Sequence, residues 1–284
     1  MFLVMVVSAS MAGSVLTVDV GRPVAEVSPT LYGLMTEEIN FSYDGGLYAE
    51  LVRNRAFLDD AEKPVHWSVV QPPGAAAVMA LDSQQPLNAA IPVSLRLDVS
   101  AATPAAPAGV ANSGYWGIPV KPATRYHASF YARAAADFSG PVTVSIVSDD
   151  GATVYASGRV RRLTADWKSY AVTLKTRRKV APTAKARLVL SVEHPGTVWF
   201  GFVSLFPPTW KNQPNGFRPD LMQMLVDLKP KFLRFPGGNY LEGDTIATRF
   251  DWKKTIGPIV DRPGHPSPWG YRSTDGMGLL EFLR

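Results

Sequence analysis

Residues 231–244, KFLRFPGGNYLEGD, constrain the fold more than any other part of this chain. The run FLRF is apolar except for one charge, Arg234, and predicts a short strand. The two glycines after Pro236 permit a sharp turn and close backbone approach, so the strand should end there. Asn239 then places a polar amide at the carboxyl end of the strand, where α/β folds carry their ligand-binding groups. The alternative interpretation is that Asn239 is an ordinary turn residue.

The composition indicates a chain that can form a packed core. Hydrophobic residues make up 46% of the 284 residues and charged residues 19%, which argues against global disorder and allows two domains. Cysteine is absent and the four histidines are scattered without metal-ligand spacing, so we expect no metal site and no cofactor. The net charge of +5 is mild and accompanies no nucleic-acid-binding motif, so we expect no nucleic-acid partner.

The first segment, residues 1–14 (MFLVMVVSASMAGS), resembles a secretory signal. An apolar run is followed by small residues, although no basic residues precede it. The segment is too short for a transmembrane helix, so we expect export, to the periplasm or out of the cell, and no membrane association. The alternative is a buried first strand in a cytoplasmic protein.

Residues 15–65 predict an N-terminal strand followed by a βα unit. The segment opens with the alternating pattern VLTVDV, and residues 31–39 (LYGLMTEEI) form an apolar strand that ends in paired carboxylates. Because neighbouring residues on a strand point to opposite faces, at most one of Glu37 and Glu38 can face a given pocket. Residues 47–57 (LYAELVRNRAF) carry an apolar stripe at helical spacing and predict the helix of the unit.

Residues 66–206 predict an antiparallel β-sandwich. Short alternating segments recur with turn signals between them, and residues 101–111 are interpreted as a Pro/Ala loop. Several aromatic residues of this region could stack on sugar rings if they were exposed, although we expect most to lie in the core. These residues are Tyr115, Trp116, Tyr126, Tyr131, Trp167 and Trp199.

Residues 207–284 predict α/β structure. Residues 219–228 (PDLMQMLVDL) have helical spacing, with Asp220 favourably placed near the helix N-terminus, and the strand FLRF follows. Residues 250–270 form an irregular Trp/Pro/Gly-rich loop, and residues 275–284 begin another helix. A closed (β/α)₈ barrel needs about 250 residues, so the segment is either a small open sheet or the start of a longer protein.

Three separated stretches, in this order, resemble one enzyme family. LYGLMTEEIN (31–40), KFLRFPGGNYLEGD (231–244) and GPIVDRPGHPSPWGYRSTDGMGLLEF (257–282) resemble the N-terminal half of the α-L-arabinofuranosidases of glycoside hydrolase family 51. GYWGIPVKPATRYHASFYARA (114–134) resembles the carbohydrate-binding-module-like domain inserted in the plant-type branch. The resemblance implies a multi-domain protein, α/β plus all-β. It implies an antiparallel jelly-roll β-sandwich inserted in the start of a (β/α)₈ TIM barrel that would be incomplete in this chain.

On this basis the chain divides into a signal segment at 1–14, the N-terminal strand and first barrel βα unit at 15–65, the sandwich at 66–206, and the truncated start of the catalytic barrel at 207–284. Strands one and two are neighbours in such a barrel, so their carboxyl ends would meet at one face.

The resemblance also implies a substrate site. Matched to the family motif, Glu37 and Asn239 would hydrogen-bond the hydroxyls of an arabinofuranose in the −1 subsite. Arg234 would orient or charge-balance the nucleophile, and Glu38 is left unassigned.

The implied activity is retaining hydrolysis of terminal non-reducing α-L-arabinofuranosyl residues in arabinan or arabinoxylan. That reaction needs an acid/base and a nucleophile carboxylate about 5 Å apart. The family's acid/base glutamate follows an asparagine, and the sequence contains no Asn-Glu dipeptide. We therefore expect no catalytic residue in this chain and no activity from it alone.

Two alternatives stay open. The sandwich could be a non-catalytic polysaccharide-binding module, or it could only brace the barrel and bind nothing. For the hydrolase and for the binding module, the expected partner is an arabinose-containing polysaccharide or oligosaccharide. The sequence makes no prediction of the oligomeric state.

Overall fold

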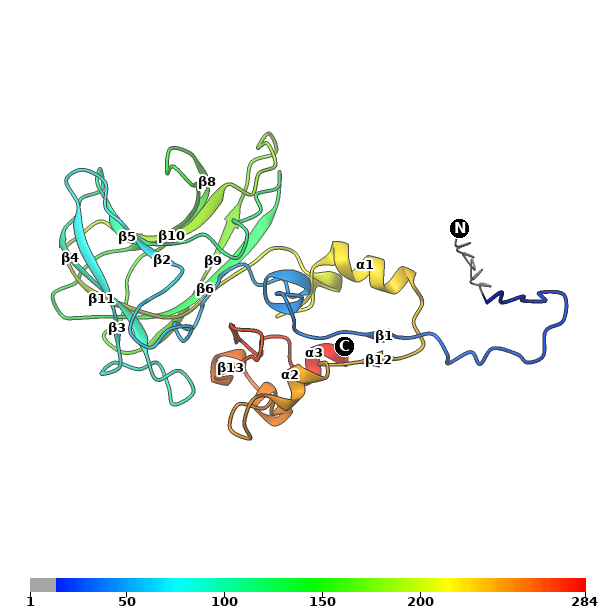
Figure 1. Ribbon diagram of the computed structural model, residues 1–284. Helices are drawn as coiled ribbons and strands as arrows, with labels where there is room; N and C mark the ends of the chain where they lie inside the picture. The colour runs from blue at the N-terminus through cyan, green and yellow to red at the C-terminus, as the bar shows by residue number, and fades with distance from the viewer. Residues whose placement is uncertain (1–13) are drawn as a thin grey trace, which may run out of the picture.

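The computed structural model describes residues 14–284, and its largest part is a β-sandwich at one end of the molecule (Figure 1). The signal-like segment 1–14 therefore lies outside the described residues, apart from Ser14. One five-stranded sheet has the order β2-β5-β10-β7-β8 and the other β3-β4-β11-β6-β9, with every neighbouring pair antiparallel. The predicted antiparallel sandwich is thus present. Its strands are β2 (Trp67–Val70), β3 (Ala76–Asp82), β4 (Ser94–Ala101), β5 (Ala108–Asn112), β6 (Arg125–Ala134), β7 (Val142–Ser148), β8 (Val154–Val160), β9 (Lys168–Lys175), β10 (Ala186–Val192) and β11 (Gly196–Phe206).

The core of the sandwich follows from two-residue periodicity. Along β6, alternate side chains from Tyr126 to Ala134 are buried while those between them face outward. Phe130 of β6 meets Phe200 of β11 edge-on, with ring centroids 6.0 Å apart. Each fully buried side chain of this size contributes about 1.5–3 kcal/mol relative to exposure, so the buried face that β6 and β11 share within their sheet is a large part of the core.

The six aromatic residues considered for sugar stacking divide by burial. Tyr126 lies in the core, and its hydroxyl donates to the Pro119 carbonyl at 2.6 Å. Four are half-buried, namely Tyr115, Tyr131, Trp167 and Trp199. Trp116 alone of the six is mostly exposed, at 65%. Only one of the six therefore lies in the core, and the prediction that most of them would do so is wrong.

A two-stranded sheet lies beside the sandwich. β1 (Leu34–Met35) pairs in parallel with β12 (Leu233–Arg234). The ladder extends past the strands, since Leu34 N donates to Phe232 O and Thr36 N to Arg234 O, both at 2.9 Å. Both strands run toward the sandwich, so their carboxyl ends lie on that side (Figure 1). The predicted parallel neighbours are confirmed.

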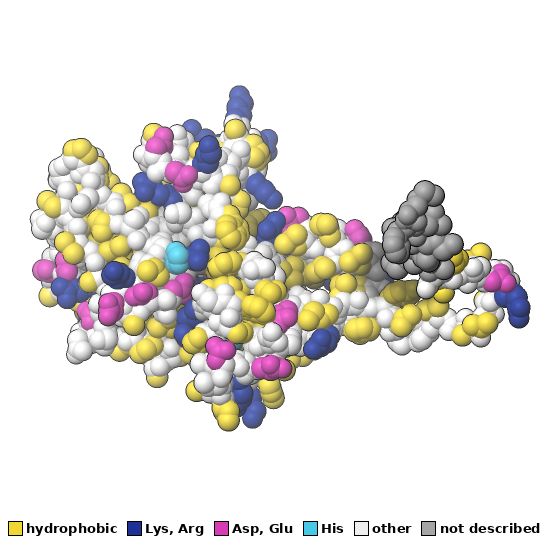
Figure 2. All heavy atoms as spheres, in the orientation of Figure 1, with side chains coloured by type: hydrophobic (Ala, Val, Ile, Leu, Met, Phe, Trp, Pro, Cys, Tyr) yellow, Lys and Arg dark blue, Asp and Glu magenta, His cyan; other side chains and the backbone are white. Residues whose placement is uncertain are grey.

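Helix α1 (Pro219–Asp227) precedes β12, as the sequence predicts. Proline at its start and Asp220 in its first turn suit a helix N-terminus. None of its residues is buried, and Met224 is well exposed. Hydrophobic side chains consequently gather on the surface over α1 and the strand pair (Figure 2).

Two predicted elements of the N-terminal region are wrong. Residues 15–20 have no regular structure and are exposed, and residues 47–57 form turns after η1 (Tyr43–Leu47) instead of a helix. Tertiary contacts override the helical spacing. Arg55 donates from Nη1 to Glu50 Oε2 at 3.2 Å, and Glu50 Oε1 accepts from Leu205 N of β11 at 2.9 Å. A buried ion pair thus attaches this segment to the sandwich.

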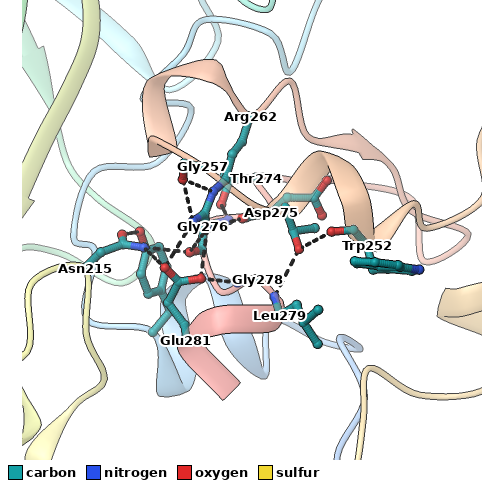
Figure 3. A network of polar contacts seen from close by, with 12 residues as sticks. Asn215, Trp252, Gly257, Arg262, Thr274, Asp275, Gly276, Gly278, Leu279 and Glu281 are labelled. Carbon is teal, nitrogen blue, oxygen red and sulfur yellow. Dashed lines mark hydrogen bonds and ion pairs between the residues drawn. The ribbon is translucent and has the colours of Figure 1, made fainter. Parts of the chain in front are cut away.

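The C-terminal region consists of short elements around a buried ion pair (Figure 3). Arg262 donates to both carboxylate oxygens of Glu281, at 3.0 and 3.1 Å, and also to the carbonyls of Gly257 and Gly276. The helix predicted over 275–284 is only one turn. The elements are η2 (Trp210–Asn212), α2 (Asn239–Glu242), η3 (Trp252–Thr255), η4 (Ile259–Asp261), β13 (His265–Pro266), β14 (Arg272–Ser273) and α3 (Leu279–Phe282). Across residues 14–284, no helix has the length and apolar character needed to cross a bilayer.

Candidate functional site

The site is built where β1 and β12 end. Glu37 lies just past β1, and its Oε1 accepts a hydrogen bond from Tyr240 N at 2.9 Å. The turn after β12 packs directly on this carboxylate, because a Cβ at Gly237 would lie only 2.2 Å from Glu37 Cγ. Gly237 also has φ = +129°, a conformation that other residues rarely adopt. The glycine turn therefore fixes the carboxylate of Glu37 against the second strand.

Asn239 and Arg234 lie at the same edge. Asn239 is the first residue of α2, next to the residue that binds Glu37, and its side chain is exposed. Arg234 lies on β12, and its Nη2 is 3.9 Å from the position of a Cβ on Gly238, so the guanidinium reaches the turn. Within residues 14–284, neither side chain is taken up by an ion pair or a side-chain hydrogen bond. The structure thus gathers the three predicted residues at one edge with the amide and guanidinium free to bind.

Glu38 points the other way and is completely buried. Its Oε2 accepts from Tyr43 N at 2.6 Å and Asp44 N at 3.3 Å, while the Tyr271 hydroxyl donates to Oε1 at 2.5 Å. Burial, and then the neighbouring charge of Asp44, raise the pKa of Glu38 to about 8. The opposite orientation of adjacent strand residues is therefore confirmed, and Glu38 acts as a structural carboxyl group.

Asp44 was not singled out in the sequence and belongs to the same buried cluster. It accepts from Thr274 N at 2.8 Å and from Thr274 Oγ1 at 2.7 Å. Burial raises its pKa despite these hydrogen bonds. Together with Glu38 and Tyr271, it joins the loop after β1 to the C-terminal segment. The only local signal was the DGG turn, which gives no hint of a partner so far along the chain.

An exposed edge that carries a carboxylate, an amide and a guanidinium can hydrogen-bond the hydroxyls of a polar ligand. It does not supply an acid and a nucleophile. Glu38 is sealed from solvent, and Glu281 is held by Arg262. Burial alone would raise the pKa of Glu281, but the hydrogen bonds and charge of Arg262 outweigh it and keep that pKa below its ordinary value. No group of metal-ligating side chains occurs within the described residues either.

Comparison with known proteins shows which enzymes the chain resembles. The profile of the alpha-L-arabinofuranosidase 1 domain matches residues 224–284. The chain is 39% identical over 260 residues to a probable alpha-L-arabinofuranosidase A of Aspergillus flavus, which covers 90% of this chain and 40% of the relative. It is 36% identical over 275 residues to alpha-L-arabinofuranosidase 1 of Arabidopsis thaliana, covering 93% of this chain and 39% of the relative.

A solved structure resembles the fold as well. An arabinose-bound α-L-arabinofuranosidase of glycoside hydrolase family 51 superposes with a TM-score of 0.81 at 39% identity, over 89% of this chain and 42% of that one. By sequence and by fold, the chain is thus related to glycoside hydrolases. Within that class it is homologous to the α-L-arabinofuranosidases of family 51, and it spans about 40% of the length of the curated relatives it matches.

Proposed function

We propose that these residues form part of a retaining α-L-arabinofuranosidase that releases terminal non-reducing α-L-arabinofuranosyl residues from arabinan or arabinoxylan. The observation that carries the proposal is the meeting of Glu37 with the turn 237–240 at the carboxyl ends of two parallel strands. Ligand-binding groups of (β/α)₈ barrels lie at this end of the strands. In the proposal, β1 and β12 are the first two strands of such a barrel, and the jelly-roll sandwich is inserted between them.

Each residue then has a role. Glu37 and Asn239 bind the hydroxyls of the arabinofuranose in the −1 subsite. Glu37 is already held by Tyr240 N at 2.9 Å, so its remaining lone pairs face the ligand without further ordering. Arg234 balances the charge of a nucleophile that approaches the same edge. The acid/base and nucleophile carboxylates are supplied from outside these residues, because the buried Glu38 and the ion-paired Glu281 cannot reach a glycosidic oxygen.

The same proposal places the protein outside the cytoplasm, where plant cell-wall polysaccharides occur. It rests on the signal-like pattern of residues 1–14.

Two measurements on the 284-residue chain test the proposal. Saturation-transfer NMR should detect binding of free L-arabinose, and Glu37→Ala and Asn239→Ala should each abolish it. Incubation with an aryl α-L-arabinofuranoside should give no turnover above a mock preparation. Arabinose binding that survives both substitutions would refute the assigned subsite, and turnover by the chain would refute the external origin of the catalytic pair.

The polysaccharide-binding alternative is favoured by one observation, the exposed Trp116 on the sandwich. It is compatible with the hydrolase proposal, since a binding cleft and a catalytic subsite can act on the same polymer.

A further inference from the structure

A cleft of about 460 Å³ separates the sandwich from the start of α1. Tyr115, Trp116 and Lys121 line it on the sandwich side, and Arg218 and Asp220 line it on the other. Its volume falls in the range of small-ligand sites, which are about 300–1,000 Å³. Glu37, Asn239 and Arg234 do not line it, so it is a separate site.

Trp116 presents a flat apolar surface in this cleft. It is 65% exposed, which is unusual because tryptophan side chains are highly buried on average. Its indole N–H donates to the Gly45 carbonyl at 3.2 Å, and the ring of Phe41 meets it edge-on at 5.7 Å. The hydrogen bond fixes one edge of the indole, and because the side chain is 65% exposed, much of the ring surface stays open to a ligand.

The backbone around Trp116 is rigid. Gly117 has φ = +88°, and a Cβ there would lie 1.8 Å from Ala184 O. Gly114 has φ = +67°, and its Cβ would lie 2.6 Å from Leu51 O. Only glycine permits these close approaches, so the chain on both sides of Trp116 is pressed against its neighbours. A platform that is ordered before binding loses little entropy when a ligand arrives.

Polar groups lie opposite this platform. Arg218 donates to both oxygens of Asp220, from Nη2 at 2.6 Å and from Nε at 3.2 Å, and both side chains are partly exposed. The two charges offset each other, while the guanidinium keeps free N–H donors and the carboxylate keeps free lone pairs. Such a pair offers adjacent donors and acceptors without a strong net charge. It suits the vicinal hydroxyl groups of a neutral ligand.

We propose that this cleft binds a neutral pentose chain, the polysaccharide backbone that carries the arabinofuranosyl branches. One sugar ring stacks its C–H face on the indole of Trp116, and its hydroxyls bond to Arg218 and Asp220. The sugar class follows from the aromatic platform and the paired-charge rim, and the choice of a pentose chain rests on the proposed function. Phe41 contacts Trp116 and lies only a short loop beyond Glu37, so a branched polymer held in the cleft has its side groups near the −1 subsite.

The test is isothermal titration of the 284-residue chain with a linear β-1,4-xylohexaose and, separately, a linear α-1,5-arabinohexaose. We expect at least one of them to bind. Trp116→Ala should weaken that binding at least tenfold, and Trp116→Phe should restore part of it because the platform remains. Arg218→Ala should weaken it severalfold. Trp252→Ala is the matched control, since Trp252 is 47% exposed and lies outside the cleft, and it should bind like the parent.

The possible results separate the two proposals. Loss of hexasaccharide binding in Trp116→Ala with partial recovery in Trp116→Phe supports the proposed cleft. The hexasaccharide that binds then identifies the polysaccharide backbone. Equal binding by the parent and Trp116→Ala, or binding of neither hexasaccharide at millimolar concentration, overturns it. In either of those cases arabinose binding that depends on Glu37 would leave the proposed function intact. Oligosaccharide binding that persists in Glu37→Ala while free arabinose binding does not is the pattern that two distinct sites require.

Discussion

Replacing Arg262 with methionine should destabilise the C-terminal region sharply. The guanidinium is buried and donates to Glu281 and to the carbonyls of Gly257, Asp275 and Gly276 (Figure 3). Methionine removes all these donors and leaves a buried carboxylate. Breaking a buried ion pair on one side typically costs about 3–5 kcal/mol. Glu281 keeps hydrogen bonds from Asn215 Nδ2 at 3.1 Å and Gly278 N at 3.0 Å, so we expect the lower part of that range.

The assay is urea denaturation combined with amide hydrogen exchange over residues 252–284. Exchange should accelerate there while the sandwich stays protected, since Arg262 has no hydrogen bond to the sandwich strands. Arg218→Met is the matched control. It breaks an exposed arginine–carboxylate pair, which should cost less than about 1 kcal/mol. The double variant Arg262→Met/Glu281→Leu should recover much of the loss, because no charge is left buried.

The dependence of stability on acid pH provides an independent check of the Arg262–Glu281 ion pair. The pKa of Glu281 is lowered in the folded protein, so its contribution to stability is present above its ordinary pKa of 4.5 and disappears as the pH falls through the folded value. That acid dependence should be smaller in Arg262→Met. Equal destabilisation by Arg262→Met and Arg218→Met would refute the reasoning, because only Arg262 is buried and also donates to backbone carbonyls.

Three further outcomes are expected. The pKa of Glu38 is raised to about 8, so the contribution of this carboxyl group to folding stability is fully present below pH 4.5 and is lost as the pH rises to 8. Glu38→Gln should therefore flatten that part of a plot of unfolding temperature against pH. Gly237→Ala should displace Glu37 and abolish arabinose binding in the NMR assay. Unchanged affinity of this variant for arabinose would mean that the backbone of the turn can shift to accommodate the added methyl group. Asn239→Ala should change the unfolding free energy by less than about 0.5 kcal/mol in urea, since the side chain is exposed, while removing arabinose binding.

The sequence predicted the sandwich wherever its strands alternate. β6 shows this clearly, because one of its faces is buried and the other is partly exposed along the whole strand. β5 (AGVAN) was interpreted as part of a loop. All of its residues are buried, so small side chains between two neighbouring strands leave no alternation to detect.

The candidate site was predictable only in part. Placing Glu37 and Asn239 together needed the family resemblance and the parallel-neighbour rule, and the structure brings the two segments into contact. The buried role of Glu38 could not be predicted, because it depends on Tyr271, 233 positions away. The helix prediction for the segment after Leu47 was wrong for a related reason. Its charged residues Glu50 and Arg55, expected to face solvent, are buried as an ion pair.

The pairing of β1 with β12 sets an order of events during folding. Glu37 and Tyr240 are 203 residues apart in sequence, and closing so long a loop in an unfolded chain is slow and entropically costly. Once the sandwich has formed, its own entry and exit segments are held side by side, because Leu51 N donates to Leu205 O at 3.0 Å and Ala49 N to Gly216 O at 3.1 Å. The sandwich then acts as a clamp that shortens the effective loop. Refolding should show an early sandwich phase, and the edge that carries Glu37 should form only after it.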